Sequence, residues 1–187
     1  RHPVTEKITG VDLVRLQIEI AQGKKLKLKQ QDLSIKGHAI EARVYAEDPI
    51  NRFLPTSGKV EHIGQCNSPN VRVETSFQNG CTVPVEYDSM IAKVSAHSEN
   101  RELAVKKLNS ALQQLPFSGI KSNRTFLMNI LQNKNFLDGH TFTSFIEKNP
   151  SLFDQPELSP ELLAAFFLKT DSMQNSDKHI SNPWLNS

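Results

Sequence analysis

Several short stretches in the first hundred residues alternate hydrophobic and polar positions with a period of two. Such alternation predicts β-strands, because successive side chains of a strand point to opposite faces. We predict strands at 37–46, 58–63, 71–76, 82–86 and 90–97. Turn-forming prolines and glycines separate several of them, which favours antiparallel neighbours.

In two longer stretches, hydrophobic residues recur every three or four positions, which predicts amphipathic helices. The first follows Thr9 and Asp12, which together resemble a capping box, and ends at Gly23. The second follows Asn100, a good helix N-cap residue, and runs to about Leu115. Its hydrophobic stripe is expected to face the core.

Three further helices are predicted in the second half of the chain. They cover 124–132, 142–147 and 161–173, and the second should bury Phe145 and Ile146. The third is too densely hydrophobic between Leu162 and Leu168 to stand alone in water. We expect that third helix to pack on this domain or on a neighbouring one, with 174–187 as a linker toward another module.

Because the predicted strands are grouped and do not alternate with helices, the fold class is α+β, with an antiparallel sheet packed by helices. Its organisation is a domain over 1–148 and a helical and linker extension over 149–187. The chain of 187 residues is long enough to bury one good core.

The composition indicates a globular protein and excludes several functional classes. The net charge is +2, from 22 basic and 20 acidic residues, so no sequence-wide field favours nucleic acid or a membrane surface. No apolar run approaches the roughly 20 residues that span a bilayer. Cys66 and Cys81 fit two free thiols better than a disulfide, and no Cys or His spacing predicts a metal site.

The stretch 41–49 is unusual because it places ionised side chains on a predicted strand. One face of this strand carries His38, Ile40, Ala42, Val44 and Ala46, and the other carries Ala39, Glu41, Arg43 and Tyr45. On the second face Glu41 can orient Arg43, as an anion-binding site requires. Alternation by itself favours the simpler interpretation, a solvated outer face of an antiparallel sheet.

Sequence motifs, in a fixed order, favour the functional interpretation. They are His2-Pro3-Val4-Thr5-Glu6, Ile8-Thr9-Gly10-Val11-Asp12-Leu13, Gly37-His38-Ala39, the stretch 41–49 and Tyr87-Asp88-Ser89-Met90-Ile91-Ala92-Lys93, with supporting blocks at 53–55, 71–75, 99–101 and 119–123. Together they resemble the carboxy-terminal domain of biotin carboxylases over residues 2 to about 148. Within that family, 72–75, 78–80, 88–93 and 145–147 most resemble the biotin-containing (alpha) subunit of methylcrotonoyl-CoA carboxylase.

The resemblance implies a ligase in which ATP activates bicarbonate and the ureido nitrogen of biotin receives the carboxyl group. Arg43 matches the catalytic arginine that holds bicarbonate and the biotin oxygen, and Glu41 would orient it. Asp88 would be a second carboxylate near the pocket, or else a turn or cap residue. His2 matches a motif at the pocket edge.

Two positions depart from the family pattern. Arg1 stands where the family has the glutamate that serves as base for bicarbonate, so it is either the end of a fragment or a lost base. Arg72 matches a dimer contact, but Pro69 replaces its aromatic neighbour. The resemblance implies a homo-oligomer, but only one of the two residues that form this dimer contact in the family is present in this chain.

The resemblance also implies what this polypeptide needs from elsewhere. Biotin, ATP and Mg²⁺ are the implied cofactors, but a glycine-rich phosphate loop and paired acidic ligands are missing from the chain, which has eight glycines. We expect the ATP-grasp half to precede this region, and the chain to be inactive alone. The implied partners are a biotinyl carrier domain and a carboxyltransferase (beta) subunit, with neither nucleic acid nor membrane.

Three hypotheses follow. The chain is the carboxy-terminal part of a biotin carboxylase subunit, or a non-catalytic binding or dimerisation module that retains the fold, or a structural fragment with a solvated charged face. The methylcrotonoyl-CoA assignment would place a eukaryotic protein in the mitochondrial matrix, in leucine degradation. A bacterial one would be cytoplasmic.

Overall fold

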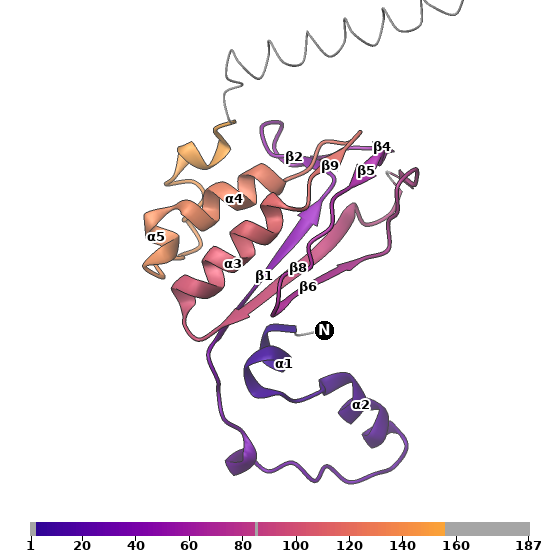
Figure 1. The fold of residues 1–187 in the computed structure, drawn as a ribbon, viewed down its shortest axis with the longest axis vertical. Helices are drawn as coiled ribbons and strands as arrows, with labels where there is room; N and C mark the ends of the chain where they lie inside the picture. Colours follow the sequence, from indigo (N-terminus) through magenta and orange to yellow (C-terminus); the bar gives the residue numbers. More distant parts are fainter. Residues whose placement is uncertain (1–2, 85, 156–187) are drawn as a thin grey trace, which may run out of the picture. The chain divides into compact units, whose positions relative to one another are not determined.

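A computed structural model describes residues 3–84 and 86–155 as helices and strands in mixed order (Figure 1). The helices are α1 (Pro3–Thr9), α2 (Leu13–Ala21), α3 (Arg101–Gln113), α4 (Arg124–Gln132) and α5 (Lys134–Leu137), with 3-10 turns η1 (Gln30–Asp32) and η2 (Pro150–Phe153). The strands are β1 (His38–Tyr45), β2 (Glu47–Asp48), β3 (Leu54–Pro55), β4 (Gly58–Lys59), β5 (His62–Ile63), β6 (Val71–Thr75), β7 (Thr82–Val83), β8 (Met90–Ser98) and β9 (Phe117–Ser118).

The main sheet has three antiparallel strands in the order β1-β8-β6. Its register pairs His38 with Ser98 at one end of β1 and Val44 with Ala92 near the other, after which it shifts before Tyr45. The pairs β2–β3, β4–β7 and β5–β9 are short and also antiparallel. The predicted α+β class with antiparallel strands is confirmed.

Helix α3 packs on the hydrophobic face of this sheet, and α4 lies beside α3 (Figure 1). Asn100 caps α3 as predicted, because its side-chain oxygen accepts a hydrogen bond from the Leu103 amide at 3.0 Å. The buried core joins residues of β1, β8, α3 and α4 with Leu115, which follows α3: Ala42, Val44, Ala92, Val94, Ala96, Val105, Leu108, Ala111, Leu112, Leu115 and Leu131. The opposite face of the sheet is therefore free to carry polar groups.

A second, smaller core lies among the short strands. It contains Ala46, Val60, Val83 and Ile91, all nearly inaccessible. The predicted strand 58–63 is divided into β4 and β5, which pair with different partners, and the predicted strand 82–86 is shorter than expected. Strands of two residues carry too little alternation to be recognised in a sequence.

The predicted helix over 142–147 is wrong. This segment consists of turns, and Ile146 is 40% exposed. A short helix, α5, precedes this segment, and Asn133 caps it by accepting hydrogen bonds from the Asn135 and Phe136 amides. The side chain of Asn149 then holds the turns, donating to the Phe145 carbonyl at 2.6 Å. Here hydrogen bonds from an asparagine side chain to the backbone take the place of the backbone hydrogen bonds of a helix.

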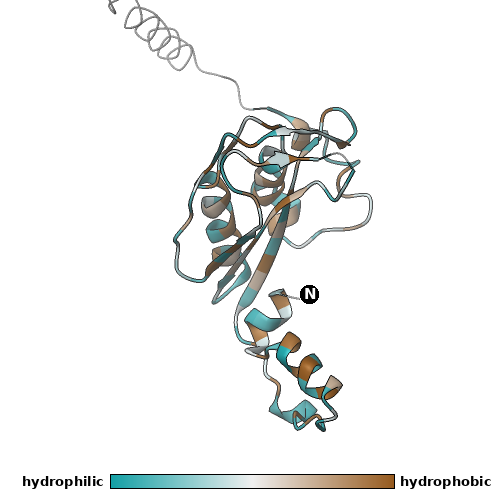
Figure 2. Cartoon of the chain, turned by 90° about the vertical axis from the view of Figure 1, so that its right-hand side faces the viewer, coloured by the Kyte–Doolittle hydropathy of each residue, from teal (hydrophilic) through white to brown (hydrophobic). Residues whose placement is uncertain are grey.

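The start of the first predicted helix also needs correction. Thr9 ends α1, a helix that periodicity did not reveal, and its hydroxyl accepts a bond from the Val11 amide. Asp12 is the N-cap of α2, and its side chain accepts a hydrogen bond from the Arg15 amide at 2.9 Å. No residue of α2 is buried, and Figure 2 shows its hydrophobic positions in brown.

The predicted helix 161–173 and linker 174–187 lie outside the described residues. By its contacts the chain divides between Asp154 and Gln155, and the domain boundary after residue 148 stays a prediction. None of the described helices is long and apolar enough to cross a membrane.

Candidate active site

The face of the main sheet opposite α3 carries two rows of polar side chains. Register places Arg43 of β1 opposite Lys93 of β8, and Lys93 opposite Glu74 of β6. The neighbouring row is formed by Glu41, Ser95 and Arg72 in the same strand order. Residues directly opposite each other on one face are close enough to interact. We call these six residues the charged face.

Arg43 and Glu41 lie together, as the sequence predicted. The Nε group of Arg43 donates to Oε1 of Glu41 at 2.9 Å. The Arg43 side chain is 56% exposed, whereas that of Glu41 is only 12% exposed. The hydrogen bond to the Glu41 carboxylate is the first cause that holds the pKa of Arg43 above its ordinary value. Glu41 engages Nε, so the outer amino groups of the guanidinium can serve a further acceptor.

Glu41 retains unused acceptor capacity. Its Oε2 atom is buried and has no hydrogen-bond partner among the described residues. A buried carboxylate oxygen without a donor is costly, and such atoms are uncommon in native structures. The pair therefore combines a fixed cation with a carboxylate that can still accept one hydrogen bond.

On β6, Glu74 binds two cations at once. Its Oε2 atom accepts from Lys93 Nζ at 2.6 Å, and its Oε1 atom is paired with Arg72. The hydrogen bond from Lys93 is the main cause that lowers the pKa of Glu74. Sequence reasoning missed the roles of Lys93 and Glu74, because they appear only once the register of β1, β8 and β6 is known.

Helix α1 adds a fourth cation beside this face. The pKa of Lys7 is lowered, first by burial and then by the nearby charge of Arg72, against the opposing effect of Glu74. Four basic side chains thus face two carboxylates, those of Glu41 and Glu74. The charged face has an excess of positive charge, as a surface that receives anions needs.

Asn123, at the start of α4, holds the backbone that carries Arg43. Its Oδ1 accepts from the Tyr45 amide at 2.9 Å, and its Nδ2 donates to the Arg43 carbonyl at 3.3 Å. The amide of Asn123 also donates to the Tyr45 carbonyl at 3.1 Å. Asn123 is buried and lies where the β1–β8 register shifts. The hydrogen bonds of Asn123 take the place of backbone hydrogen bonds between strands at the point where strand pairing is interrupted.

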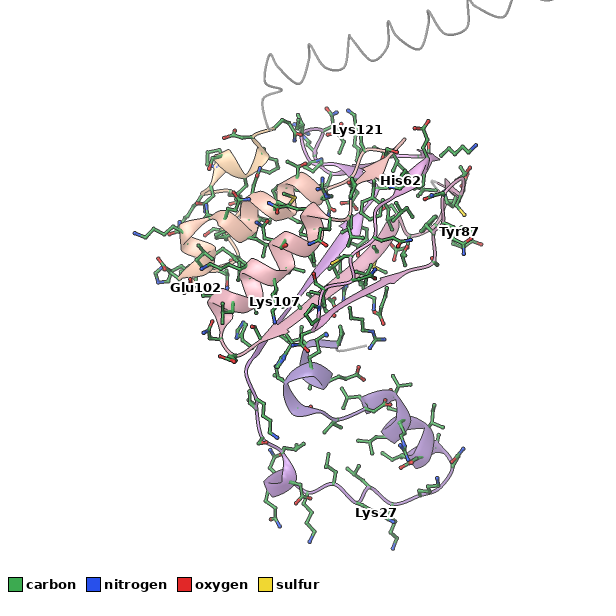
Figure 3. The ribbon with its side chains drawn as sticks, in the orientation of Figure 1. Lys27, His62, Tyr87, Glu102, Lys107 and Lys121 are labelled. Atoms are coloured by element: carbon green, nitrogen blue, oxygen red, sulfur yellow. The ribbon has the colours of Figure 1, made fainter. Side chains whose placement is uncertain are left out.

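Asp88 forms a turn at the start of β8. Its Oδ1 accepts from the Met90 amide at 3.1 Å, and its side chain is exposed. Its charge contributes to raising the pKa of Glu47, for which burial is the larger cause. Among the described residues no hydrogen bond or ion pair joins Asp88 to Arg43, so its pocket role stays a prediction. The label of Tyr87, the residue before Asp88, marks the position of this turn in Figure 3.

The other predicted site residues are distributed differently. Arg72 belongs to the charged face, two residues from Glu74. His2 and Arg1 lie outside the described residues. Within 3–84 and 86–155 no group of three or more His, Cys, Asp or Glu side chains could hold a metal ion.

Two protein families match parts of this chain. Residues 41–148 match the family described as biotin carboxylase C-terminal domain, and residues 1–29 match the carbamoyl-phosphate synthase L chain ATP binding domain. The first match covers more than half of the chain. The chain therefore belongs to the biotin carboxylase C-terminal domain family, which confirms the resemblance found in the sequence.

Individual relatives agree with this assignment. The chain is 45% identical over 147 residues to a biotin carboxylase of Haemophilus influenzae, covering 79% of this chain and 33% of the relative. It is 36% identical over 190 residues to the mitochondrial methylcrotonoyl-CoA carboxylase subunit alpha of Dictyostelium discoideum, covering 98% of this chain and 27% of the relative.

Among solved structures, the chain resembles the biotin carboxylase domain dimer of the 2-oxoglutarate carboxylase of Hydrogenobacter thermophilus, in complex with MgADP, ADP and bicarbonate. The TM-score is 0.81 and the identity 40%, over 84% of this chain and 35% of that one. The chain spans about a third or less of the length of its relatives.

Proposed function

We propose that this chain is the carboxy-terminal part of an ATP-dependent biotin carboxylase subunit of an acyl-CoA carboxylase. Arg43 would stabilise the anions of the reaction, with Glu41 holding its guanidinium in place. The observation that carries the proposal is the Arg43–Glu41 pair at 2.9 Å, on a sheet face with more basic than acidic groups.

The chemistry suits an arginine in this position. Bicarbonate, its phosphorylated form and the deprotonated ureido group of biotin are all anions, and a fixed cation stabilises charge that develops during the reaction. An arginine keeps its proton near neutral pH and offers a planar fork to a carboxylate. In this proposal Asp88 and His2 line the pocket around biotin.

ATP and Mg²⁺ would bind to an ATP-grasp region of the complete subunit. The match of residues 1–29 to an ATP binding domain supports this, because 29 residues are too few to form such a domain. The biotin carboxylase of Haemophilus influenzae is also about three times as long as the matched region. The chain alone is expected to be inactive.

The finer assignment is methylcrotonoyl-CoA carboxylase. Mitochondrial alpha subunits of that enzyme from mouse, rat, Dictyostelium discoideum and Arabidopsis thaliana are 36% to 42% identical to this chain. In that case the protein would act in leucine degradation in the mitochondrial matrix, or in the cytoplasm of a bacterium. Its partners would be a biotinyl carrier domain, a carboxyltransferase beta subunit and a second copy that contacts Arg72.

A chimeric enzyme tests the proposal. Residues 2–155 replace the matching region of the Haemophilus influenzae biotin carboxylase, and biotin-dependent ATP cleavage is measured. We expect an active chimera, and a loss of about 100-fold or more in kcat on Arg43→Ala, since removing a charge-stabilising group costs about that much. Arg43→Lys should restore little, because lysine lacks the planar fork.

Arg15 provides the matched control. It is also an exposed arginine whose Nε donates to a glutamate, Glu19, at 3.2 Å, but it lies on α2. Arg15→Ala should leave kcat unchanged. Equal activity of the Arg43→Ala and Arg15→Ala chimeras would refute the proposed role of Arg43.

The alternative is a binding or dimerisation module that retains the fold without catalysis. The observation that favours it is Arg1, which stands where the family has the glutamate that acts as general base. A second chimera that begins at Arg1 should be inactive, and Arg1→Glu in it should restore activity. If both chimeras stay inactive although they fold, the non-catalytic module is the better account.

A further inference from the structure

Lys93 is the nearest basic neighbour of Arg43 by strand register. The two residues are directly opposite each other on β8 and β1, so their side chains leave the sheet side by side. Each is at present neutralised by its own carboxylate: Arg43 by Glu41 at 2.9 Å, and Lys93 by Glu74 at 2.6 Å. Two cations are thus held together while neither pairs with the other's carboxylate.

Glu74 can release Lys93 without becoming an unpaired charge. Its second oxygen is paired with Arg72, so the carboxylate stays neutralised when the ammonium group leaves. An unpaired, partly buried carboxylate would oppose such a movement, and Arg72 removes that cost. Lys93 is therefore the mobile member of the Arg72–Glu74–Lys93 group.

The Lys93 side chain is not enclosed. A hollow of about 380 Å³ lies beside it and is lined by residues of β6 and β8 and by Ser76. The Lys93 side chain is 22% exposed. A four-carbon stem can redirect its ammonium group by rotamer changes alone.

We propose that Lys93 is the second cation of the anion site, and that Glu74 is its resting partner. When a small carboxylate-like anion such as bicarbonate binds the outer amino groups of Arg43, the ammonium group of Lys93 leaves Glu74 and contacts the anion. This inference rests on the proposed function and adds to it a second anion-binding residue with a competing carboxylate.

The test is bicarbonate titration of the 187-residue chain, observed through the NMR signal of the Arg43 Nε–H group. Lys93→Met should raise the Kd for bicarbonate about fivefold, and Lys93→Arg should keep it within about twofold of the parent, because one exposed ion pair changes affinity by such factors. Glu74→Gln should lower the Kd about twofold or more, because the competing carboxylate is gone.

Glu102 and Lys106 on α3 give a matched control. Their atoms are also 2.6 Å apart, and Figure 3 shows Glu102 on the other side of the molecule from Tyr87. Lys106→Met and Glu102→Gln change the net charge equally and should leave the Kd unchanged. At about 0.15 M salt the screening length is about 8 Å, so a change of charge far from the site has little effect on the Kd for bicarbonate.

Opposite signs for Lys93→Met and Glu74→Gln would show that Lys93 favours anion binding and Glu74 opposes it, whereas a merely structural ion pair would weaken binding in both. An unchanged Kd in Lys93→Met, weaker binding in Glu74→Gln, or no saturable shift in the parent chain would overturn the inference. Far-UV circular dichroism verifies that each variant is folded.

The outcome can be separated from the proposed function. An inactive chimera together with Lys93-dependent bicarbonate binding would reject the carboxylase role and keep the anion site. An active, Arg43-dependent chimera together with normal binding by Lys93→Met would reject only the role of Lys93.

Discussion

At the scale of single residues, Asn123 shows how a side chain far away in the sequence can set the geometry of a site. It binds the carbonyl of Arg43 and the amide of Tyr45 across a separation of about eighty residues. Its amide satisfies both a donor and an acceptor where the β1–β8 register shifts. The backbone at Arg43 is thereby held from the side that faces α4.

Asn123→Ala should reduce the free energy of unfolding by about 1–3 kcal/mol, because two backbone groups lose their buried partner. It should also lower the kcat of the chimera, since Arg43 is less firmly held. Urea denaturation and the ATP-cleavage assay measure the two effects.

Asn129 is the matched control for this prediction. Its side chain also donates to two carbonyls, those of Leu152 and Asp154, but these belong to η2 and the residue after it. Asn129→Ala should destabilise the fold and leave kcat unchanged. An Asn123→Ala chimera with full kcat would show that Asn123 does not position Arg43.

The sequence was sufficient to predict that the side chains of Arg43 and Glu41 lie together, because both belong to one predicted strand, two residues apart. Lys93, Glu74 and Asn123 could not be placed in the same way. Whether these residues lie near Arg43 depends on which strands pair and in which register. A shift of one residue would move a strand's side chains to the other face of the sheet. A single sequence does not contain that information.

At the scale of elements, α3 is the helix that fixes the sheet. Four of its buried residues, Val105, Leu108, Ala111 and Leu112, belong to the stripe that the sequence periodicity predicted. Leu103 was also predicted in that stripe but is 40% exposed, and the buried Ala104 was not. By contrast, α5 depends on the side-chain amide of Asn133, and the turns at 142–149 depend on that of Asn149, and neither carries a periodic signal. Long periodic helices were predictable for that reason, and short capped ones were not.

Leu108→Ala should reduce the free energy of unfolding by about 2–5 kcal/mol, as expected for a fully buried leucine whose removal leaves a cavity. Leu103, on the same helix, is 40% exposed, and Leu103→Ala should cost less than about 1 kcal/mol. Urea denaturation of both variants gives the comparison. Equal losses would mean that α3 does not bury the face that contains Leu108.

At the scale of the whole molecule, stability is expected to be unequal between the two ends of residues 3–155. Helix α2 buries none of its residues, whereas α3 buries five. The groove beside α2 is lined by Leu16, Ile20 and Leu26 with lysines at its rim. A helix without tertiary burial gains little stability beyond its own propensity.

Amide hydrogen exchange should therefore be faster in α2 than in α3, by about 100-fold or more in protection factor. Exchange followed by mass spectrometry on the 187-residue chain measures both helices in one experiment. Similar protection of α2 and α3 would indicate that α2 is covered in solution, for example by a second copy of the chain. Repeating the measurement at several protein concentrations distinguishes that case.

The order of the main sheet has a consequence for synthesis. The central strand β8 is the last of the three to be made, so β1 remains without its partner until residue 98 has been added. At about 5–20 residues per second, this wait lasts about 3–10 seconds after Tyr45. During that time the nascent strand exposes Ile40 and Val44, and the ionised Glu41 and Arg43 between them oppose aggregation.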